Sequence, residues 1–535
     1  FIDGQQPTAT TTNHPPIRSH IYILLFFSYL RAVVGENVSS VAVLQYYSIT
    51  MGASNGNSSD KDGVVYIQNH STKIWLVVLA MTQITLAAGL IVGWPGIAGS
   101  LLVAPESAGG AGLSLDQTTQ LYSMAAAVNY VAPLFLGYVL DKLGPRWCSV
   151  LSNGIVAAGL VGLSCATEYN TFALALALVA FGGPSCQQCL LHVGNLFAKK
   201  RFFVMGMVAE SITLSFAVLP VMDILWHSIE GMSFRTLFAG LGALVAVSAI
   251  LSSLCWPDKP YPVLPVPKGD VDTNKTDETQ VLMGDKDKEK QVDDEKEEDD
   301  PNDLKHLSFW GQFTSGVYLR LVIFFIVTSW WANFYIATVT TELGDQQLFS
   351  AEEQHNLTRW LSFLDAGAIV FAPLSGYMLD SVGFAATATT TLLVGALQQA
   401  LLLMAGTSST VMIVSFAVYA LFRSFLFPYF FATLSRQMGF AHFGLLSGMG
   451  FCVSGLTQFT VAPVALWVQG DCHHFLSDPF SCDEGRWTLI HIVQMAQLLL
   501  MLILPYMDWR RDVRQEQEKL QLAKESKATY GATTY

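Results

Sequence analysis

Three charged side chains lie inside long apolar stretches of this sequence, where a charge is costly and usually serves a function. Arg423 lies 13 residues into the run 410–434, about 20 Å at ~1.5 Å per residue, and Asp365 lies six residues into the run 359–379. A guanidinium is a planar fork that suits a carboxylate, so Arg423 is a candidate clamp for a substrate's carboxyl group. A permanent ion pair with Asp365 and a cap on backbone carbonyls are the alternatives. Asp365 is also a candidate partner for a substrate's ammonium group.

Glu210 is the third of these charges and lies near the start of the run 203–222. A carboxyl group at this position is a candidate proton or ammonium site. The alternative is a buried carboxyl group that only packs between helices.

Polar, glycine and tryptophan residues in the same runs extend the candidate substrate site. Amides there need partners, and roughly half of such residues only join helices to one another. The Gly-Gly-Pro stretch 182–184 interrupts its run and frees backbone groups that a substrate can use. A Trp supplies an apolar wall, although membrane-interface anchoring is its commoner role. The candidates are Asn129, Gly182, Gly183, Gln187, Asn333 and Trp94.

A phrase at the end of one apolar run, "GYVLDKLGPRW" at 137–147, returns as "GYMLDSVGFAA" at 376–386. The glycines, aspartates and second glycines all repeat with an offset of 239 residues, which indicates duplication of half the chain. The first glycine permits a close helix approach, the aspartate can cap a neighbouring helix N-terminus, and the second glycine makes a tight turn. We expect a conformational latch between the two halves, formed by Gly137, Asp141, Lys142, Gly144, Arg146, Gly376, Asp380 and Gly383. The alternative is a polar turn that only fixes topology.

Motifs for catalysis are missing from the sequence. A nucleophile elbow, a phosphate-binding loop and a His/Cys set with metal-ligand spacing do not occur, so we predict no enzyme activity, no cofactor and no metal. Cys472 and Cys482 share one predicted outer loop, where we expect a disulfide. The six cysteines inside apolar runs, including Cys148 and Cys189, are expected to be reduced thiols.

The elements that position these residues follow from composition. Of 535 residues, 52% are hydrophobic and 13% are charged, and the mean hydropathy is +0.40. A soluble chain normally carries about 25% charge. Residues 267–305 hold fifteen acidic against seven basic residues, a net of −8 out of −13 for the chain. The sequence therefore predicts a membrane protein with one acidic insert and no basic face for nucleic acid.

Twelve apolar runs are long enough to cross a bilayer, which takes about 20 residues per helix. The fold class is therefore an all-α membrane protein with twelve transmembrane helices in two six-helix bundles. Short loops rich in Lys and Arg, such as 199–201, place both termini in the cytoplasm. The predicted runs are 74–103, 118–140, 147–166, 171–196, 203–222, 235–256, 310–338, 359–379, 385–405, 410–434, 443–468 and 487–508.

The domain division follows from these runs. We predict an N-terminal cytoplasmic segment 1–73, a first bundle 74–256, a disordered cytoplasmic insert 257–309, a second bundle 310–508 and a cytoplasmic tail 509–535. We also expect translation to start at Met51, so that residues 1–50 are not part of the native protein. The insert is expected to be a solvated linker, with the docking of a regulatory partner as the alternative.

The repeated phrase resembles the G-x-x-x-D-[RK]-x-G-x-[RK] signature of the major facilitator superfamily. The first copy matches throughout, whereas the second has Ser381 in place of the basic residue and lacks the last one. This resemblance implies that spans 1, 2, 4, 5, 7, 8, 10 and 11 line a central cavity. Within the superfamily the chain is most similar to solute carrier family 43, through "GLIVGWPGI" (89–97), "FGGPSCQQCLLHVGNLF" (181–197), "NFYIATV" (333–339), "FRSFLF" (422–427), "HFGLLSGM" (442–449) and "SDPF" (477–480).

The resemblance implies a sodium-independent, facilitative carrier of large neutral amino acids that works by alternating access. The partners would then be an amino-acid substrate and the lipid bilayer, and the host membrane would be the plasma membrane or an endomembrane such as the vacuole. Two alternatives stay open: a carrier of nucleobases or organic anions, with or without proton coupling, and a nutrient sensor that transports nothing.

Overall fold

The computed structural model contains only helices in the part of the chain that it describes. The described residues are 67, 69–98, 100–263, 304–345, 349–405, 408–469, 486–514, 517 and 521. The expected segment 1–50, most of the acidic insert and the expected disulfide between Cys472 and Cys482 lie outside these residues.

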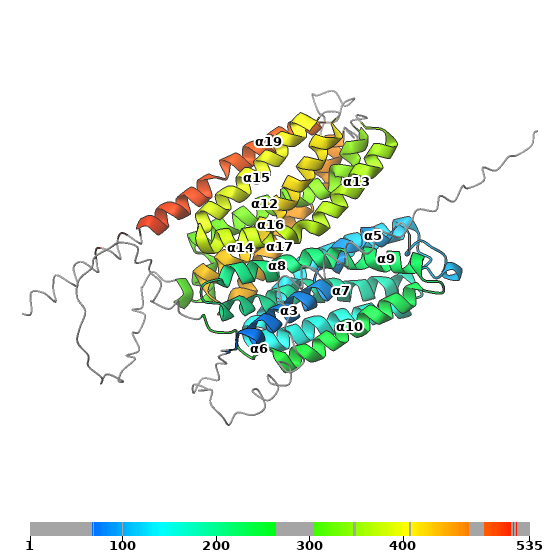
Figure 1. The fold of residues 1–535 in the computed structure, drawn as a ribbon, viewed down its shortest axis with the longest axis horizontal. Helices are drawn as coiled ribbons and strands as arrows, with labels where there is room; N and C mark the ends of the chain where they lie inside the picture. Colours follow the sequence, from blue (N-terminus) through cyan, green and yellow to red (C-terminus); the bar gives the residue numbers. More distant parts are fainter. Residues whose placement is uncertain are drawn as a thin grey trace, which may run out of the picture.

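The N-terminal half forms one group of packed helices, drawn from blue to green in Figure 1. Serine residues begin two of them: Ser114 forms a capping box with Gln117, and the Ser233 side chain accepts the Thr236 backbone N–H. The helices are α3 (His70–Ala87), α4 (Leu90–Gly93), α5 (Pro95–Ala98), η1 (Glu106–Ala108), α6 (Leu115–Cys165), α7 (Tyr169–Leu190), η2 (Leu191–Leu196), α8 (Arg201–Phe216), α9 (Val218–Ser228) and α10 (Phe234–Cys255).

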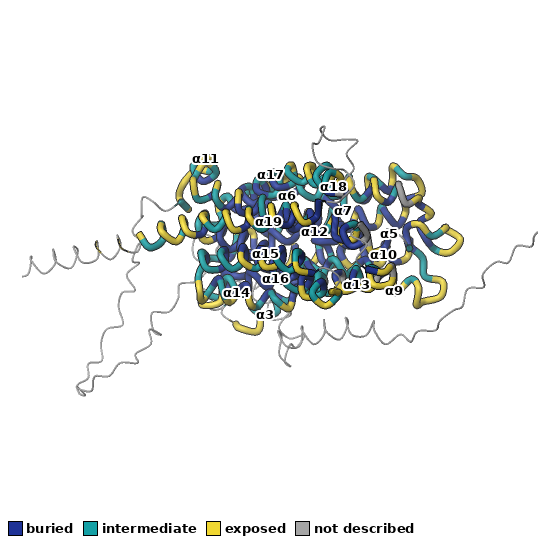
Figure 2. Tube along the Cα trace, turned by 90° about the horizontal axis from the view of Figure 1, so that it is seen from above, coloured by how far each residue is buried: buried dark blue, intermediate teal, exposed yellow. Residues whose placement is uncertain are grey.

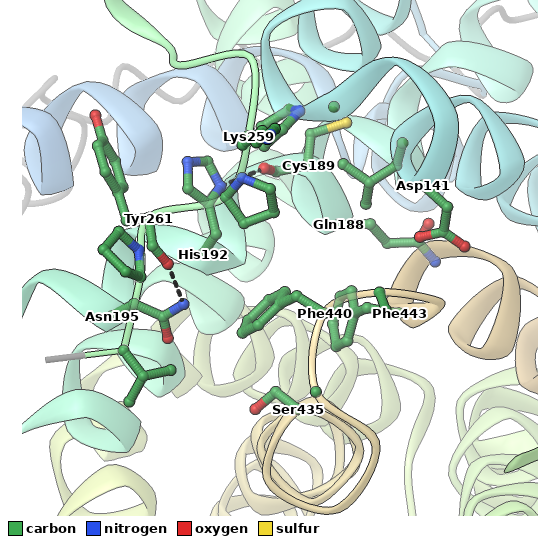
Figure 3. A pocket seen from close by; sticks show the side chains of 18 of the residues that line it. Asp141, Gln188, Cys189, His192, Asn195, Lys259, Tyr261, Ser435, Phe440 and Phe443 are labelled. Atoms are coloured by element: carbon green, nitrogen blue, oxygen red, sulfur yellow. Dashed lines mark hydrogen bonds between the residues drawn. The ribbon is translucent and has the colours of Figure 1, made fainter. Parts of the chain in front are cut away.

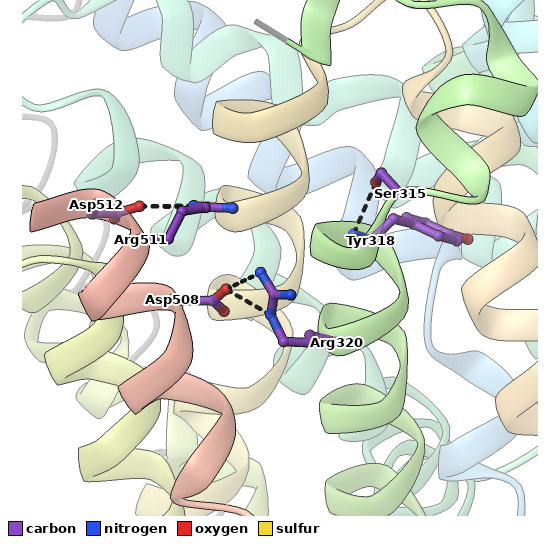
Figure 4. Close-up of polar contacts among 6 residues, drawn as sticks. All are labelled: Ser315, Tyr318, Arg320, Asp508, Arg511 and Asp512. Atoms are coloured by element: carbon purple, nitrogen blue, oxygen red, sulfur yellow. Dashed lines mark hydrogen bonds and ion pairs between the residues drawn. The ribbon is translucent and has the colours of Figure 1, made fainter. Parts of the chain in front are cut away.

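The C-terminal half forms the second group, drawn from yellow-green to red in Figure 1. Its helices are η3 (Leu304–His306), α11 (Phe309–Phe313), α12 (Gly316–Asp345), α13 (Ala351–Ala366), η4 (Gly367–Phe371), α14 (Ala372–Ser381), α15 (Phe384–Ala405), α16 (Ser409–Met438), α17 (Phe443–Gln458), α18 (Val461–Gln469) and α19 (Trp487–Leu500). A partly buried ion pair joins α12 to the C-terminal end of this group: Arg320 of α12 donates from Nε and Nη2 to Asp508 over 2.8 and 2.6 Å (Figure 4).

The helix α6 supplies two membrane spans. Its apolar part, Gln117–Cys165, has 49 residues, which is about 74 Å at ~1.5 Å per residue and more than twice the ~30 Å of a bilayer core. The backbone breaks at Gly144, where φ is +81°, a value that glycine adopts without strain. The second glycine of the repeated phrase therefore makes the predicted turn.

Nine helices in the described part are long and apolar enough to cross a membrane, and the bent pair Glu352–Asp365 and Gly367–Ser381 makes a tenth. Counting α6 twice and adding α3, which α4 and α5 continue, gives twelve crossings. The predicted fold class, two six-helix bundles, is confirmed.

Apolar side chains occupy both the interior and the outer faces of the bundles. Aliphatic and aromatic residues fill the helix contacts inside, and Figure 2 shows this buried interior surrounded by exposed segments. Large apolar residues such as Leu174, Ile250 and Met404 are more than half exposed. An outer surface of this kind matches lipid and not water.

The two halves approach each other most closely where α6 meets α17 and where α8 meets α14. A Cβ on Gly137 would collide with the carbonyl group of Gly444, and a Cβ on Gly376 would lie 2.5 Å from the Cα of Phe203. The first glycine of each repeated phrase therefore lets a helix backbone of one half touch that of the other.

Candidate functional site

An ion pair joins Arg423 of α16 to Asp365 of α13 in the C-terminal half. Nη1 of Arg423 donates to both carboxylate oxygens of Asp365, over 2.9 and 2.8 Å. The two side chains are 10% and 14% exposed. Helix α13 ends at the residue after Asp365 and continues as the 3-10 turn η4, so the carboxylate lies where the span bends. The ion pair that the sequence analysis gave as an alternative is therefore present, and both of its hydrogen bonds use one nitrogen of the guanidinium.

The N-terminal half contributes an aromatic ring and a carboxylate to the same place. The guanidinium carbon of Arg423 lies 4.8 Å from the ring centroid of Phe216 in α8, within cation–π range. Glu210, also in α8, interacts electrostatically with both Arg423 and Asp365. Its side chain is buried, and its two carboxylate oxygens accept no hydrogen bond from the residues that the structure describes. One guanidinium and two carboxylates from different halves thus form a central charged cluster.

Tyrosine hydroxyl groups surround this cluster. Tyr419, one turn before Arg423, donates its hydroxyl proton to the carbonyl oxygen of Ala332 over 2.8 Å. Tyr122 and Tyr130 of α6 also interact electrostatically with Arg423. These groups supply polar contacts without adding charge.

Asn333 links the two halves beside the cluster. Its amide nitrogen donates to the hydroxyl oxygen of Tyr130, so α12 of one half contacts α6 of the other. The sequence analysis identified Asn333 as a candidate for the substrate site but did not identify Tyr130. Asn129, the residue before Tyr130, is half-buried on α6.

Four of the predicted substrate-binding residues do not surround Arg423. Gln187 donates to the carbonyl oxygen of Ala209 over 2.6 Å, which ties α7 to α8. Trp94 packs against residues of its own half and lines a small apolar space inside it. In this arrangement both side chains contact residues of the N-terminal half, and their role in substrate binding stays a prediction.

Gly182 and Gly183 also serve packing. A Cβ on Gly182 would lie 2.6 Å from the carbonyl oxygen of Ser152, and one on Gly183 would lie 3.0 Å from that of Ala87. Both glycines therefore let α7 pack closely against its neighbours. The helix also continues through Pro184, so the expected break with free backbone groups is absent at this stretch.

The aspartates of the repeated phrase each cap a helix of the opposite half. Asp141 accepts the backbone N–H groups of Gly444 and Leu445 in α17 over 2.7 and 2.8 Å. Asp380 accepts those of Phe202 and Phe203 in α8 over 3.0 and 2.7 Å. A carboxylate at a helix N-terminus satisfies free N–H groups and favours the helix dipole. The duplicated phrase thus forms two matching contacts across the interface.

The basic residues of the phrase do not take part in these contacts. Arg146 pairs with Asp258 over 3.0 Å and donates from Nε to the carbonyl oxygen of Trp256, so it ties the segment after α10 to α6 in the same half. Lys142 is exposed, with its ammonium group 5.9 Å from the ring centroid of Tyr138. The latch expectation therefore changes for Lys142 and Arg146: the contacts between halves come from the aspartates and glycines. Gly383 has φ +109° and makes the turn into α15.

The sequence analysis missed a second buried polar cluster, within the C-terminal half. His491 of α19 contacts Glu342 of α12 through Nε2 and Gln399 of α15 through Nδ1, both over 2.8 Å. All three side chains are buried. The predicted span ended at 338, which put Glu342 in a loop, whereas α12 continues to Asp345. A longer span would have marked Glu342 as an intramembrane charge.

One cysteine expectation is wrong. The structure joins Cys148 of α6 to Cys189 of α7 by a disulfide, with their Cα atoms 6.2 Å apart, so these two are not reduced thiols. The partner of Cys189 thus lies on the preceding span.

Relatives in two parasites carry amino acid transporter names. The chain is 22% identical over 143 residues to the cationic amino acid transporter 8 of Plasmodium berghei (strain Anka), covering 26% of this chain and 28% of that protein. It is 24% identical over 227 residues to the amino acid transporter 6-1 of Toxoplasma gondii (strain ATCC 50611 / Me49), covering 40% of each. The chain thus matches less than half the length of these relatives.

Solved transporter structures share the fold. A proton:xylose symporter, XylE, superposes with a TM-score of 0.59 at 13% identity, covering 82% of this chain and 96% of that one. The human organic anion transporter MFSD10 superposes with a TM-score of 0.54 at 14% identity, covering 82% and 100%. At such low identity these likenesses concern the fold alone.

The strongest comparison is with a family model. The model of the Major Facilitator Superfamily matches residues 74–462, which is well over half of the chain and includes both copies of the repeated phrase. Together with the twelve crossings, this match shows that the protein is an integral membrane transporter, and not an enzyme, that belongs to the Major Facilitator Superfamily.

Proposed function

We propose that the protein is a sodium-independent, facilitative carrier of large neutral amino acids, as the resemblance to solute carrier family 43 implies. The observation that carries this proposal is the central charged cluster, in which Arg423 and Asp365 pair beside Glu210 at the interface between the halves. An amino acid carries one carboxylate and one ammonium group. The cluster offers a guanidinium to the carboxylate and carboxylates to the ammonium group.

The substrate binds by replacing contacts within the cluster. The substrate's carboxylate competes with Asp365 for the guanidinium, whose planar fork favours a bidentate contact. Its ammonium group then takes Asp365 or the carboxylate of Glu210. Because a zwitterion pairs with both Arg423 and Asp365, it costs less to hold in the membrane than an anion, which would leave Asp365 without its partner.

Alternating access is supported by the arrangement of contacts between the halves. The caps made by Asp141 and Asp380 gather at one end of the bundles, where the short loops rich in Lys and Arg favour the cytoplasmic side. Rocking of one half against the other breaks these caps and opens that end. In this proposal both termini lie in the cytoplasm, and the host membrane is the plasma membrane or an endomembrane.

Cationic amino acids are the second candidate substrate. Two carboxylates, Asp365 and Glu210, accompany a single guanidinium, so an extra positive charge on the substrate has a partner. The name of the Plasmodium berghei relative agrees with this candidate.

Uptake measurements in a transport-deficient host test the proposal. Radiolabelled leucine is offered with competing phenylalanine, arginine, a nucleobase or a carboxylate, with and without sodium. Competition by phenylalanine that does not depend on sodium supports a neutral amino acid carrier, and stronger competition by arginine supports the cationic candidate. Competition only by the nucleobase or carboxylate contradicts both, and a surface-expressed protein without flux indicates a sensor.

A further inference from the structure

A cavity of about 1050 Å³ lies between the two halves at the end where the aspartate caps gather. Figure 3 shows Asp141, Gln188 and His192 of the N-terminal half on one side and Ser435, Phe440 and Phe443 of the C-terminal half on the other. None of Arg423, Asp365 and Glu210 lines it. It is therefore separate from the central charged cluster.

The walls of this cavity carry an excess of positive charge. Its acidic residues, Asp141 and Asp258, are already engaged: Asp141 caps α17, and Asp258 pairs with Arg146. Five cationic side chains from both halves line the same space: Lys142, Arg201, Lys259, Lys305 and Arg436. At this density of charge an anion with several negative groups gains more than a simple carboxylate does.

Buried polar groups without hydrogen-bond partners line the same space. Gln188 is 2% exposed, and neither its amide nitrogen nor its amide oxygen has a partner among the described residues. His192 is equally buried: Nδ1 lies 2.8 Å from the carbonyl oxygen of Cys189, and Nε2 has no partner in that part of the chain. The same holds for Nε and Nη2 of Arg201. Because such groups are costly to bury, each needs a partner that a ligand can supply.

We propose that this cavity binds a soluble, multiply phosphorylated small molecule of nucleotide size. Ligand sites for molecules of that size occupy roughly 300–1,000 Å³, which the cavity matches. Phosphate oxygens accept from Arg201 and Arg436 in charge-assisted hydrogen bonds, and the amide of Gln188 and Nε2 of His192 complete the contacts.

The ligand also favours one arrangement of the transporter. It contacts both halves only while Asp141 and Asp380 cap their helices, because the cavity lies between the halves at that end. Binding therefore stabilises the closed end and slows transport, whatever the transported substrate is.

Binding of ATP and of inorganic tripolyphosphate to the purified full-length protein tests this proposal. Each probe is expected to raise the unfolding temperature by about 2 °C or more at saturation. Gln188→Leu keeps the side-chain volume and loses the amide, so it should preserve or raise the stability of the free protein and weaken binding about tenfold or more. Arg436→Gln should also weaken binding, whereas Arg510→Gln makes the same charge change outside the cavity and should not.

Several outcomes overturn the proposal. One is the absence of binding by either probe, and another is equal affinity in Gln188→Leu, Arg436→Gln and Arg510→Gln. A third is stabilisation only by vesicles that contain phosphoinositides, which identifies a lipid headgroup. The last is binding of the probes only after the Asp and Glu residues in 293–300 are replaced by Asn and Gln. That result would show that the acidic insert, and not a small molecule, occupies the cavity.

Discussion

Asp141 and Asp380 are 239 residues apart in the sequence and make the same contact in opposite directions. Each carboxylate accepts two consecutive backbone N–H groups at the beginning of a helix in the other half: Asp141 at α17 and Asp380 at α8. The halves are thus joined by two contacts related by the duplication.

Replacing one of these aspartates should open that end more often. Asp141→Asn keeps the shape but loses the charge, and hydrogen bonds to a charged group contribute about 1.5–3 kcal/mol. We expect a cysteine introduced at Ser435, which lines the cavity, to react with a maleimide about tenfold faster in this variant.

The matched control is Asp223→Asn. Asp223 accepts the hydroxyl group of Ser100 within the N-terminal half, away from the interface. Its replacement should leave the labelling rate unchanged. Equal rates in Asp141→Asn and Asp223→Asn would contradict the role of the caps.

Arg423→Lys should reduce uptake at least tenfold at equal surface expression. Lysine keeps the charge but offers a point contact in place of a planar fork, so it cannot hold Asp365 and a substrate carboxylate in the same way. Uptake of labelled leucine measures the effect. Arg320→Lys is the control, because Arg320 also pairs with an aspartate in a partly buried site of the same half but lies outside the central cluster (Figure 4). Undiminished uptake by Arg423→Lys removes the carboxylate clamp.

The sequence predicted the spans and the interface better than the substrate site. Length and apolar composition determine a transmembrane helix, and the duplication marked Asp141 and Asp380 without any alignment. The pair of Arg423 and Asp365 was also predictable, because two opposite charges inside apolar runs have few other partners.

Residues on α7 show why a substrate site is harder to predict than a span. Composition identifies a polar or small residue within a span but not the direction in which it points. Gln187 therefore suggested substrate contact, although it bonds to the backbone of α8. His491 was missed because its partner Glu342 lies beyond the predicted end of its span, and helix ends are the least predictable feature of a sequence.

The contact between His491 and Glu342 should be important for stability. Removing one partner of a buried hydrogen bond costs the other partner a polar contact, at about 1–3 kcal/mol. We expect His491→Gln and Glu342→Gln each to lower the unfolding temperature of the purified protein. The double variant should lose less than the sum, with a coupling of about 0.5–3 kcal/mol.

The exposed residue His227 provides the control for this cycle. It contacts Asp223 on the surface of α9, so His227→Gln should change the unfolding temperature little. Strict additivity of His491→Gln and Glu342→Gln would show that the two side chains do not stabilise each other.

Gly137→Ala should prevent complete closure of the interface. An added Cβ would collide with the backbone of Gly444, which cannot move aside as a flexible side chain does. We expect slower transport, together with faster labelling of a cysteine at Ser435.

Gly240→Ala is the control, and its expected effect on stability is favourable. Gly240 lies in α10 with nothing within 4 Å of the added Cβ, so alanine should stabilise that helix by about 0.5–1 kcal/mol. Because both variants make the same chemical change, a loss of transport in both would point to a general effect, whereas loss only in Gly137→Ala locates it at the contact between α6 and α17.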